Sequence, residues 1–318
     1  MRTATGVLLL VAAASLVAGC NRSDDGSDDD AAPTISAEIA SFDLAAGRDQ
    51  RFIVGLIGDN NQLLAYGKVT LRFAYAGTRE QPIRRAQAGP PVEATYLPIA
   101  GQPVDPTKTG PRPVNPSEAR GVYGAEPVRF DQAGIWGVVA EGTIAGKRFT
   151  VQDAFEVKTE PQVVAIGQPA PRTQNPLPGA PTLPATAIDS RADAGTVPDP
   201  ELHSTTIADA LAAGRPVTVV VSTPVYCVSR FCGPITDSVQ QLAQQAGDRM
   251  AFVHLEVWQD FENKVVNTAT QEWILPRDGS NAGEPWVFVV GSDGTVLARF
   301  DNVATDAGLR QAVQSTRG

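Results

Sequence analysis

Two closely spaced cysteines in the last third of the chain are the residues best suited to chemistry. Cys227 and Cys232 are separated by four residues in the run CVSRFCGP. A cysteine pair at short spacing can cycle between a dithiol and a disulfide. On one continuous helix the two side chains would point about 140° apart, so we expect a loop over 227–231 and a helix that begins near Gly233. A disulfide can close such a loop where the two Cα atoms come within about 7 Å.

The elements around these cysteines alternate between strand and helix. Apolar, β-branched runs at 216–222 and 251–258 are typical of strands buried on both faces. A short helix is predicted at 207–213, and a second one follows the cysteines, with Ile235, Val239 and Leu242 on one face. A third strand at 284–290, a turn at 291–294, a strand at 295–300 and a helix at 306–314 complete the order.

This order, with the cysteines directly after the first buried strand, resembles the thioredoxin fold. The resemblance rests on the cysteine pair, on Cys-Gly-Pro at 232–234, and on Glu-Pro-Trp at 284–286 before a strand. It implies a cis-proline at Pro285 that faces the cysteines and binds the backbone of an extended substrate. Thioredoxins have two residues between their cysteines, and this chain departs from that pattern with four. The implied activity is thiol–disulfide exchange on protein thiols, with no cofactor and no metal.

Two arguments about the attacking cysteine conflict. Cys232 is predicted at a helix N-terminus, where the helix dipole and free N–H groups favour a thiolate. Arg230 between the cysteines would stabilise that thiolate further. Counted from the preceding strand, however, Cys227 takes the usual attacking position of the thioredoxin-like proteins. The helix argument favours Cys232 as nucleophile and Cys227 as resolving cysteine, but the sequence alone does not decide.

Other interpretations of the cysteine pair remain open. In a non-catalytic surface-binding or scaffold protein, the disulfide would only hold a loop in place. A peroxiredoxin-like site is a lesser option, because Ser229 lies three residues before Cys232 but the proline expected four residues before that serine is missing. Copper delivery resembling the Sco-type branch requires a Cys-x3-Cys motif and a later histidine, and no histidine follows His254.

Few other residues have types and positions that suggest a site. Glu256 shares a predicted strand face with His254 and is a candidate buried carboxylate near the cysteines, with an ion pair at the sheet end as the alternative. We expect His254 to be a satisfied core histidine and His203 to be exposed. With only two histidines in the chain, a multi-histidine zinc or iron site is nearly excluded. The net charge of −9 argues against a nucleic-acid partner bound through a basic surface.

The N-terminus predicts export and lipid attachment. Residues 1–20, MRTATGVLLLVAAASLVAGC, contain an apolar run that is too short to span a bilayer but fits a secretory signal. Leu-Val-Ala-Gly-Cys at 16–20 resembles a bacterial lipobox, which implies lipidation of Cys20 and anchoring to the outer face of the cytoplasmic membrane or to another envelope membrane. An ordinary cleaved signal is the alternative. Residues 21–33 carry five aspartates and are predicted to form a disordered acidic tether.

The rest of the chain predicts a β domain and a linker. Residues 34–160 contain short alternating strands and resemble the immunoglobulin-like domains of bacterial surface and periplasmic proteins. Dense proline and glycine over 81–127 predict a long irregular loop there. Nine prolines at 161–200 predict an extended linker before residues 201–318. The predicted fold class is therefore multi-domain, with an antiparallel Ig-like β-sandwich followed by an α/β thioredoxin-like fold.

Overall fold

The computed structural model describes residues 33–229, 231–276 and 283–316. Residues 33–318 belong to one compact unit. Two predicted site residues, Cys20 and Arg230, lie outside the described residues, as do the signal and nearly all of the acidic tether. Among the described residues, no helix has both the length and the apolar character needed to cross a membrane.

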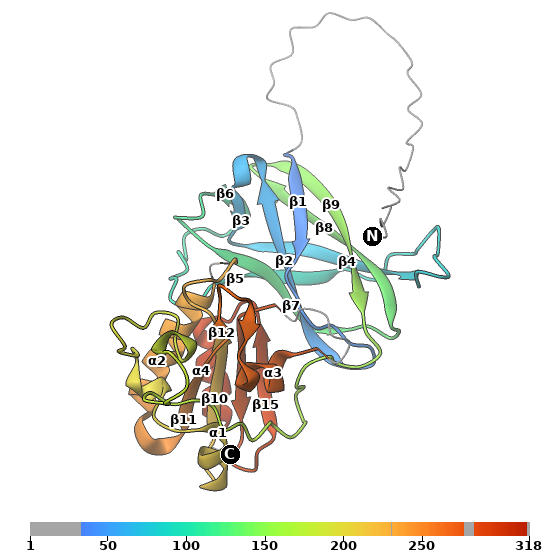
Figure 1. The fold of residues 1–318 in the computed structure, drawn as a ribbon. Helices are drawn as coiled ribbons and strands as arrows, with labels where there is room; N and C mark the ends of the chain where they lie inside the picture. The colour runs from blue at the N-terminus through green and yellow to red at the C-terminus, as the bar shows by residue number, and fades with distance from the viewer. Residues whose placement is uncertain (1–32, 230, 277–282, 317–318) are drawn as a thin grey trace, which may run out of the picture. The chain divides into compact units, whose positions relative to one another are not determined.

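The N-terminal half is a nine-stranded antiparallel sheet, coloured blue to green in Figure 1. The hydrogen-bonded path runs β6-β3-β2-β7-β5-β4-β8-β9, and β1 pairs with β2. The strands are β1 (Ile35–Ile39), β2 (Asp49–Gly58), β3 (Leu63–Ala65), β4 (Lys68–Gly77), β5 (Val92–Pro98), β6 (Arg112–Val114), β7 (Gly121–Arg129), β8 (Gly134–Ile144) and β9 (Lys147–Val157).

The core of this half follows the alternation seen in the sequence. Inward-facing side chains recur at every second position of β4, as expected where one face of a strand is buried. Four phenylalanines from different strands and one connection meet in tilted or edge-to-face contacts: Phe52, Phe73, Phe130 and Phe155. Such contacts stabilise a core beyond the area they bury.

The expectation of one long irregular loop over 81–127 is wrong. Strands β5 and β6 and most of β7 lie in this segment. Proline is compatible with these strands because of its position: Pro113 lies in β6, which pairs only with β3 at the end of the path, and Pro98 is the last residue of β5. Pro127 lies in the inner strand β7, where the pairing with β2 shifts register. An edge strand, a strand end or a bulge does not require every backbone N–H.

The C-terminal half contains a four-stranded sheet of order β11-β10-β14-β15. Its strands are β10 (Val217–Ser222), β11 (Ala251–Glu256), β14 (Trp286–Val290) and β15 (Val296–Asp301), and a short pair is formed by β12 (Trp258–Asp260) and β13 (Val265–Val266). Strands β10 and β11 are parallel, whereas β14 is antiparallel to both β10 and β15. The described structure as a whole is thus mostly antiparallel β-sheet with few helices.

Helices cover both faces of this sheet. They are α1 (Ile207–Ala212), α2 (Cys232–Ala246), α3 (Thr268–Ile274) and α4 (Asp306–Ser315). Val219 of β10 belongs to the cluster that includes Trp273 of α3, and Val220 belongs to the cluster that includes Val239 of α2 and Leu309 of α4. Because successive side chains of a strand point to opposite faces, the two clusters lie on the two sides of the sheet. The predicted order of strands and helices is confirmed.

The proline-rich segment 161–200 lacks long helices and strands, as its composition predicts, but it is packed against the C-terminal half. Its regular structure is limited to the one-turn helix η3 (Ala185–Ala187) and the start of η4 (Pro200–Leu202). Its backbone bonds to the start of β15, where Gly167 N donates to Val296 O at 2.9 Å and Val296 N donates to Gln168 O at 2.9 Å. Val163 and Ala170 are buried in the same apolar cluster as Trp273.

Candidate functional site

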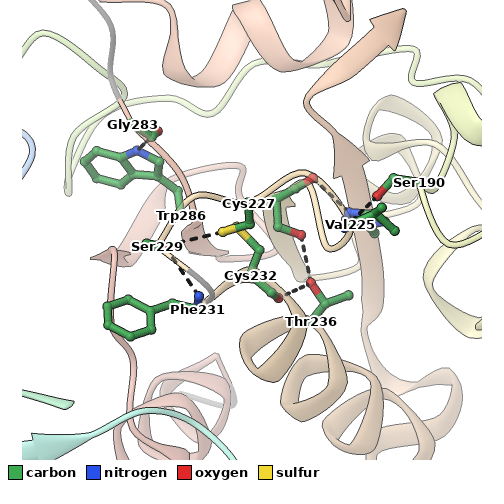
Figure 2. Close-up of a disulfide and its surroundings, with 11 residues drawn as sticks. Ser190, Val225, Cys227, Ser229, Phe231, Cys232, Thr236, Gly283 and Trp286 are labelled. Carbon is green, nitrogen blue, oxygen red and sulfur yellow. Dashed lines mark hydrogen bonds between the residues drawn. A yellow bond between two sulfur atoms is a disulfide. The ribbon is translucent and has the colours of Figure 1, made fainter. Parts of the chain in front are cut away.

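Cys227 and Cys232 form a disulfide at the point where β10 gives way to α2 (Figure 2). Their Cα atoms are 6.0 Å apart. The predicted loop is confirmed, and α2 begins at Cys232, one residue before the expected start. The nine residues 223–231 therefore connect the buried strand to the first turn of a 15-residue helix, and the bridge closes the last part of this connection.

The two cysteines differ in exposure. Cys232 is completely buried at 0% exposure, whereas Cys227 is partly exposed. The neighbouring Val228 is 92% exposed, so the loop between the cysteines projects into solvent. Burial excludes an external thiol from Cys232, and Cys227 is the more accessible of the two residues. This difference favours Cys227 as the exchanging cysteine, the reverse of the order that the helix argument alone favoured.

Hydroxyl groups surround the disulfide (Figure 2). Ser229 Oγ lies 3.3 Å from Cys227 Sγ and accepts a bond from Phe231 N at 3.4 Å. On the other side, Thr236 Oγ1 donates to Cys232 O at 2.8 Å and lies 2.7 Å from Ser222 Oγ. Ser222 therefore donates to Thr236, and this chain ties the first turn of α2 to the end of β10.

Glu256 is buried close to the start of the cysteine loop. It is 1% exposed, and its carboxylate accepts bonds from Ser190 N at 2.9 Å and Trp258 N at 3.2 Å. Ser190 Oγ in turn accepts a bond from Val225 N at 3.2 Å. The expected burial of Glu256 is confirmed, and no ion pair to it is found among the described residues. Through Ser190 it is linked to the segment that carries Cys227.

Pro285 directly precedes β14 and lies near the end of the neighbouring strand β10 where the cysteine loop begins. The next residue, Trp286, pairs with Val221 in β10. Pro285 is buried, the Glu284–Pro285 peptide bond is cis, and Pro285 O accepts a bond from Asn302 N at 2.8 Å. Burial, followed by the charge of Glu256, raises the pKa of Glu284. The sheet thus brings the predicted proline and the cysteine loop to one end of adjacent strands.

An apolar hollow of about 630 Å³ lies beside the cysteine loop. Tyr226 and Val228 line it from the loop, and Trp258, Phe261 and Lys264 line it from the β12–β13 region. The Tyr226 and Phe261 rings stack at 3.9 Å between centroids. Lys264 Nζ lies 3.5 Å from the centre of the Phe261 ring.

A second hollow of about 500 Å³ is lined by Val228, Ser229 and Phe231. Glu284 lines both hollows.

A buried polar cluster that the sequence analysis did not anticipate lies next to Ser190. His203 and His254 both face the same oxygen of Asp189: His203 Nε2 is 3.5 Å and His254 Nδ1 is 3.3 Å from Asp189 Oδ2. The expectation that His203 is exposed is wrong, since it is 4% exposed beneath the proline-rich segment. His254 is a buried histidine of β11, as expected, with Nε2 3.2 Å from Ser222 O.

Arg191 neutralises the carboxylate of this cluster. Its Nη2 lies 2.7 Å from Asp189 Oδ2, and its Nε donates to Oδ1 at 3.0 Å. Burial alone would raise the pKa of Asp189, but the two imidazoles and Arg191 hold this pKa far below its ordinary value. Burial also lowers the pKa of His203, which favours its neutral form. No local motif marks the cluster, because its members come from positions 189, 203 and 254; the only signal in the sequence is the rarity of histidine.

Comparisons with known proteins add little to this site. No protein-family model and no curated protein matches the chain. Among solved structures, the crystal structure of BslA, described as a bacterial hydrophobin, is 14% identical, with 39% of this chain and 98% of that chain covered. The TM-score is 0.18, which is too low to support a common fold.

Proposed function

We propose that residues 201–318 form a thioredoxin-like domain in which Cys227 and Cys232 exchange with thiols of extracytoplasmic proteins. The observation that carries this proposal is the asymmetric disulfide, with a partly exposed cysteine on the loop and a buried cysteine in the first turn of α2. A bridge that only closes a loop does not need a partly exposed cysteine between two residues that line an apolar hollow. The strand order β11-β10-β14-β15 with helices on both faces supports the thioredoxin-like assignment.

The geometry suggests the order of the exchange steps. A substrate thiolate attacks Cys227 Sγ, a bond forms between the two sulfurs, and the Cys227–Cys232 bond breaks. Cys232 leaves as a thiolate, which the N-terminus of α2 stabilises, and a better-stabilised leaving thiolate departs faster. A second substrate thiolate then attacks its own mixed-disulfide sulfur and releases Cys227 as a thiolate. The substrate dithiol is oxidised to a disulfide, the protein takes up two electrons, and the reverse sequence reduces a substrate disulfide.

The hollows on both sides of Val228 suit an apolar, extended segment of a substrate protein. The larger one presents aromatic faces, and Val225 and Leu275 nearby are 55% and 56% exposed. Apolar side chains on either side of a substrate cysteine can fill such hollows while its sulfur reaches Cys227. Pro285 at the neighbouring strand end is proposed to position the substrate backbone.

The remaining parts of the chain are proposed to hold this domain in the cell envelope. The lipobox-like sequence that ends at Cys20 supports a lipid anchor, and the acidic tether supports separation from the membrane. The nine antiparallel strands of residues 34–160 support an Ig-like β-sandwich that acts as a spacer or interaction module. The protein partners are therefore sought in the extracytoplasmic space.

The reduction potential of the cysteine pair tests the proposal. The full-length protein is equilibrated with defined glutathione ratios, and its turnover is followed by insulin reduction in the presence of dithiothreitol. We expect a potential above about −300 mV and measurable turnover. The matched control is the Cys227→Ser/Cys232→Ser variant, which retains the fold elements but has no exchangeable bridge. A potential well below that value with no turnover would identify the bridge as purely structural.

A further inference from the structure

The Asp189 cluster contains both histidines of the 318-residue chain. They lie 51 residues apart in sequence, one after η4 and one in β11, yet both turn a ring nitrogen toward a single carboxylate oxygen. All three side chains are completely or almost completely buried. Ionisable groups are rarely buried together without a partner that satisfies them.

The contact between His254 and a backbone carbonyl shows which ring nitrogen carries a hydrogen. His254 Nε2 lies 3.2 Å from the carbonyl oxygen of Ser222, which can only accept, so Nε2 carries the hydrogen. In the neutral ring, Nδ1 then has a lone pair, and this lone pair faces Asp189 Oδ2 at 3.3 Å. Two electron pairs that face each other repel, and either a proton on Nδ1 or a metal ion between the two atoms removes this repulsion. A ring N–H bonded to a backbone carbonyl is also the usual outer contact of a metal-bound histidine.

His203 turns its Nε2 toward the same oxygen. Among the described residues, neither His203 Nε2 nor His254 Nδ1 has a hydrogen-bond partner. Their distances to Asp189 Oδ2, 3.5 and 3.3 Å, exceed the usual N–H···O length of about 2.9–3.0 Å. In a tetrahedral zinc site each ligand atom lies about 2.0–2.1 Å from the ion, so two ligand atoms are about 3.3 Å apart. The two distances to Asp189 Oδ2 match this separation.

We propose that Asp189, His203 and His254 form a binding site for a divalent transition-metal ion of the zinc class. Two imidazoles and a carboxylate are suitable ligands for such ions. The three ligand atoms lie within 4.8 Å of one another, and the two separations that involve Asp189 fit a shared tetrahedral ion. The composition argument against a multi-histidine site does not exclude this one, because a carboxylate completes the set. This site is separate from the disulfide and does not depend on the proposed exchange activity.

The bound ion would fasten the proline-rich segment and the turn after it to the sheet. Asp189 lies in the segment, His203 follows η4, and His254 lies in β11. Arg191 competes with the ion for Asp189 Oδ2, while Asp189 Oδ1 also accepts bonds from Arg191 N and Nε. Removing the guanidinium of Arg191 should therefore tighten metal binding. If hydrogen bonds alone held the cluster, the same change would only remove a hydrogen-bond partner of Asp189.

Calorimetric titration of the chelator-treated full-length protein with Zn²⁺ tests the proposal. We expect one ion per chain with a dissociation constant of about 1 µM or tighter, and an upward shift of Tm on zinc addition. The His203→Asn/His254→Asn variant keeps every carboxylate of the chain, including the aspartates near the N-terminus, and should lose this binding. Arg191→Gln should bind at least several-fold more tightly. Retention of stoichiometric binding by the double variant would overturn the proposal.

Spectroscopy of the unmodified protein provides a test that does not depend on how the variants fold. With Cu²⁺ or Co²⁺ at one equivalent, pulsed electron paramagnetic resonance or X-ray absorption should detect two imidazole ligands. Because the chain has only two histidines, such a signal can come only from His203 and His254. A spectrum without imidazole ligands, or with one, would contradict the proposed site, and so would the absence of zinc binding by the unmodified protein.

Discussion

Cys227 and Cys232 are joined by a disulfide, yet one of the two residues is partly exposed and the other is completely buried. The buried cysteine is the first residue of α2, and the exposed one lies five residues earlier in the loop. This arrangement separates two properties that often coincide in one reactive cysteine. Cys227 has access to other molecules, while Cys232 has the electrostatic advantage of the helix N-terminus.

The first prediction concerns accessibility in the reduced protein. We expect iodoacetamide to alkylate Cys227 about tenfold or more faster than Cys232, because Cys227 is partly exposed and Cys232 is buried. Mass spectrometry of peptides after short exposure measures both rates. In the matched single variants, Cys232→Ser should trap a mixed disulfide with a substrate protein or glutathione, and Cys227→Ser should not. The opposite pattern would make Cys232 the exchanging cysteine.

The second prediction concerns the hydroxyl group beside Cys227. Ser229 Oγ, 3.3 Å from the sulfur, can donate to a Cys227 thiolate. Replacing it in Ser229→Ala should raise the pKa of the Cys227 thiol and slow its alkylation at neutral pH about threefold. The pH profile of alkylation separates this effect from a general loss of structure. Ser36→Ala, which removes an exposed hydroxyl that bonds to Ile57 O in the β1–β2 pair, serves as the control and should leave the profile unchanged.

The third prediction is a pH dependence of stability in the chelator-treated protein. Burial lowers the pKa of His203 in the folded state, with Asp189, His254 and Asp199 as its charged or titratable neighbours. The unfolded chain then binds a proton below about pH 6.5 that the folded chain does not. The free energy of unfolding should therefore decrease as the pH falls below this value, by at most about 1.4 kcal/mol per pH unit.

Urea unfolding at several pH values between about 7.5 and 5.5 measures this slope in the range where His203 acts. His203→Gln removes the titrating ring and should flatten the curve. Asp189 acts in the same direction only at lower pH, because its pKa is lowered and its stabilisation is lost below about pH 4. An equally steep curve in the variant would show that another group causes the dependence.

The fourth prediction tests the attachment of the proline-rich segment. Asn267 is buried, and its side chain caps α3 by accepting a hydrogen bond from Ala269 N. The same side chain donates a hydrogen bond to Ala187 O in the proline-rich segment at 3.1 Å. Asn267→Ala should destabilise the protein by about 2 kcal/mol, since a helix cap and a buried hydrogen bond are lost together. Asn263→Ala, at an exposed turn where the side chain bonds only to Asp260, should cost well under 1 kcal/mol. Equal effects would mean that the segment is not held through Asn267.

The sequence by itself determined the features that depend on local chemistry. Alternation predicted strands such as β2 and β4, and a continuous β-branched run predicted β10. The cysteine spacing predicted the loop before α2, whose start was expected near Gly233. Proline density was less informative over 81–127, because proline is accepted at edge strands, strand ends and bulges, and local sequence does not show where these lie.

Only the tertiary structure decided which side chains meet and which are exposed. The exposure of Cys227 and the burial of Cys232 depend on what covers the first turn of α2, and helix propensity carries no information about that. Asp189, His203 and His254 come together because the proline-rich segment folds back over the edge of a sheet whose outer strand is β11. Such contacts between distant positions arise from packing and leave no periodic pattern in the chain.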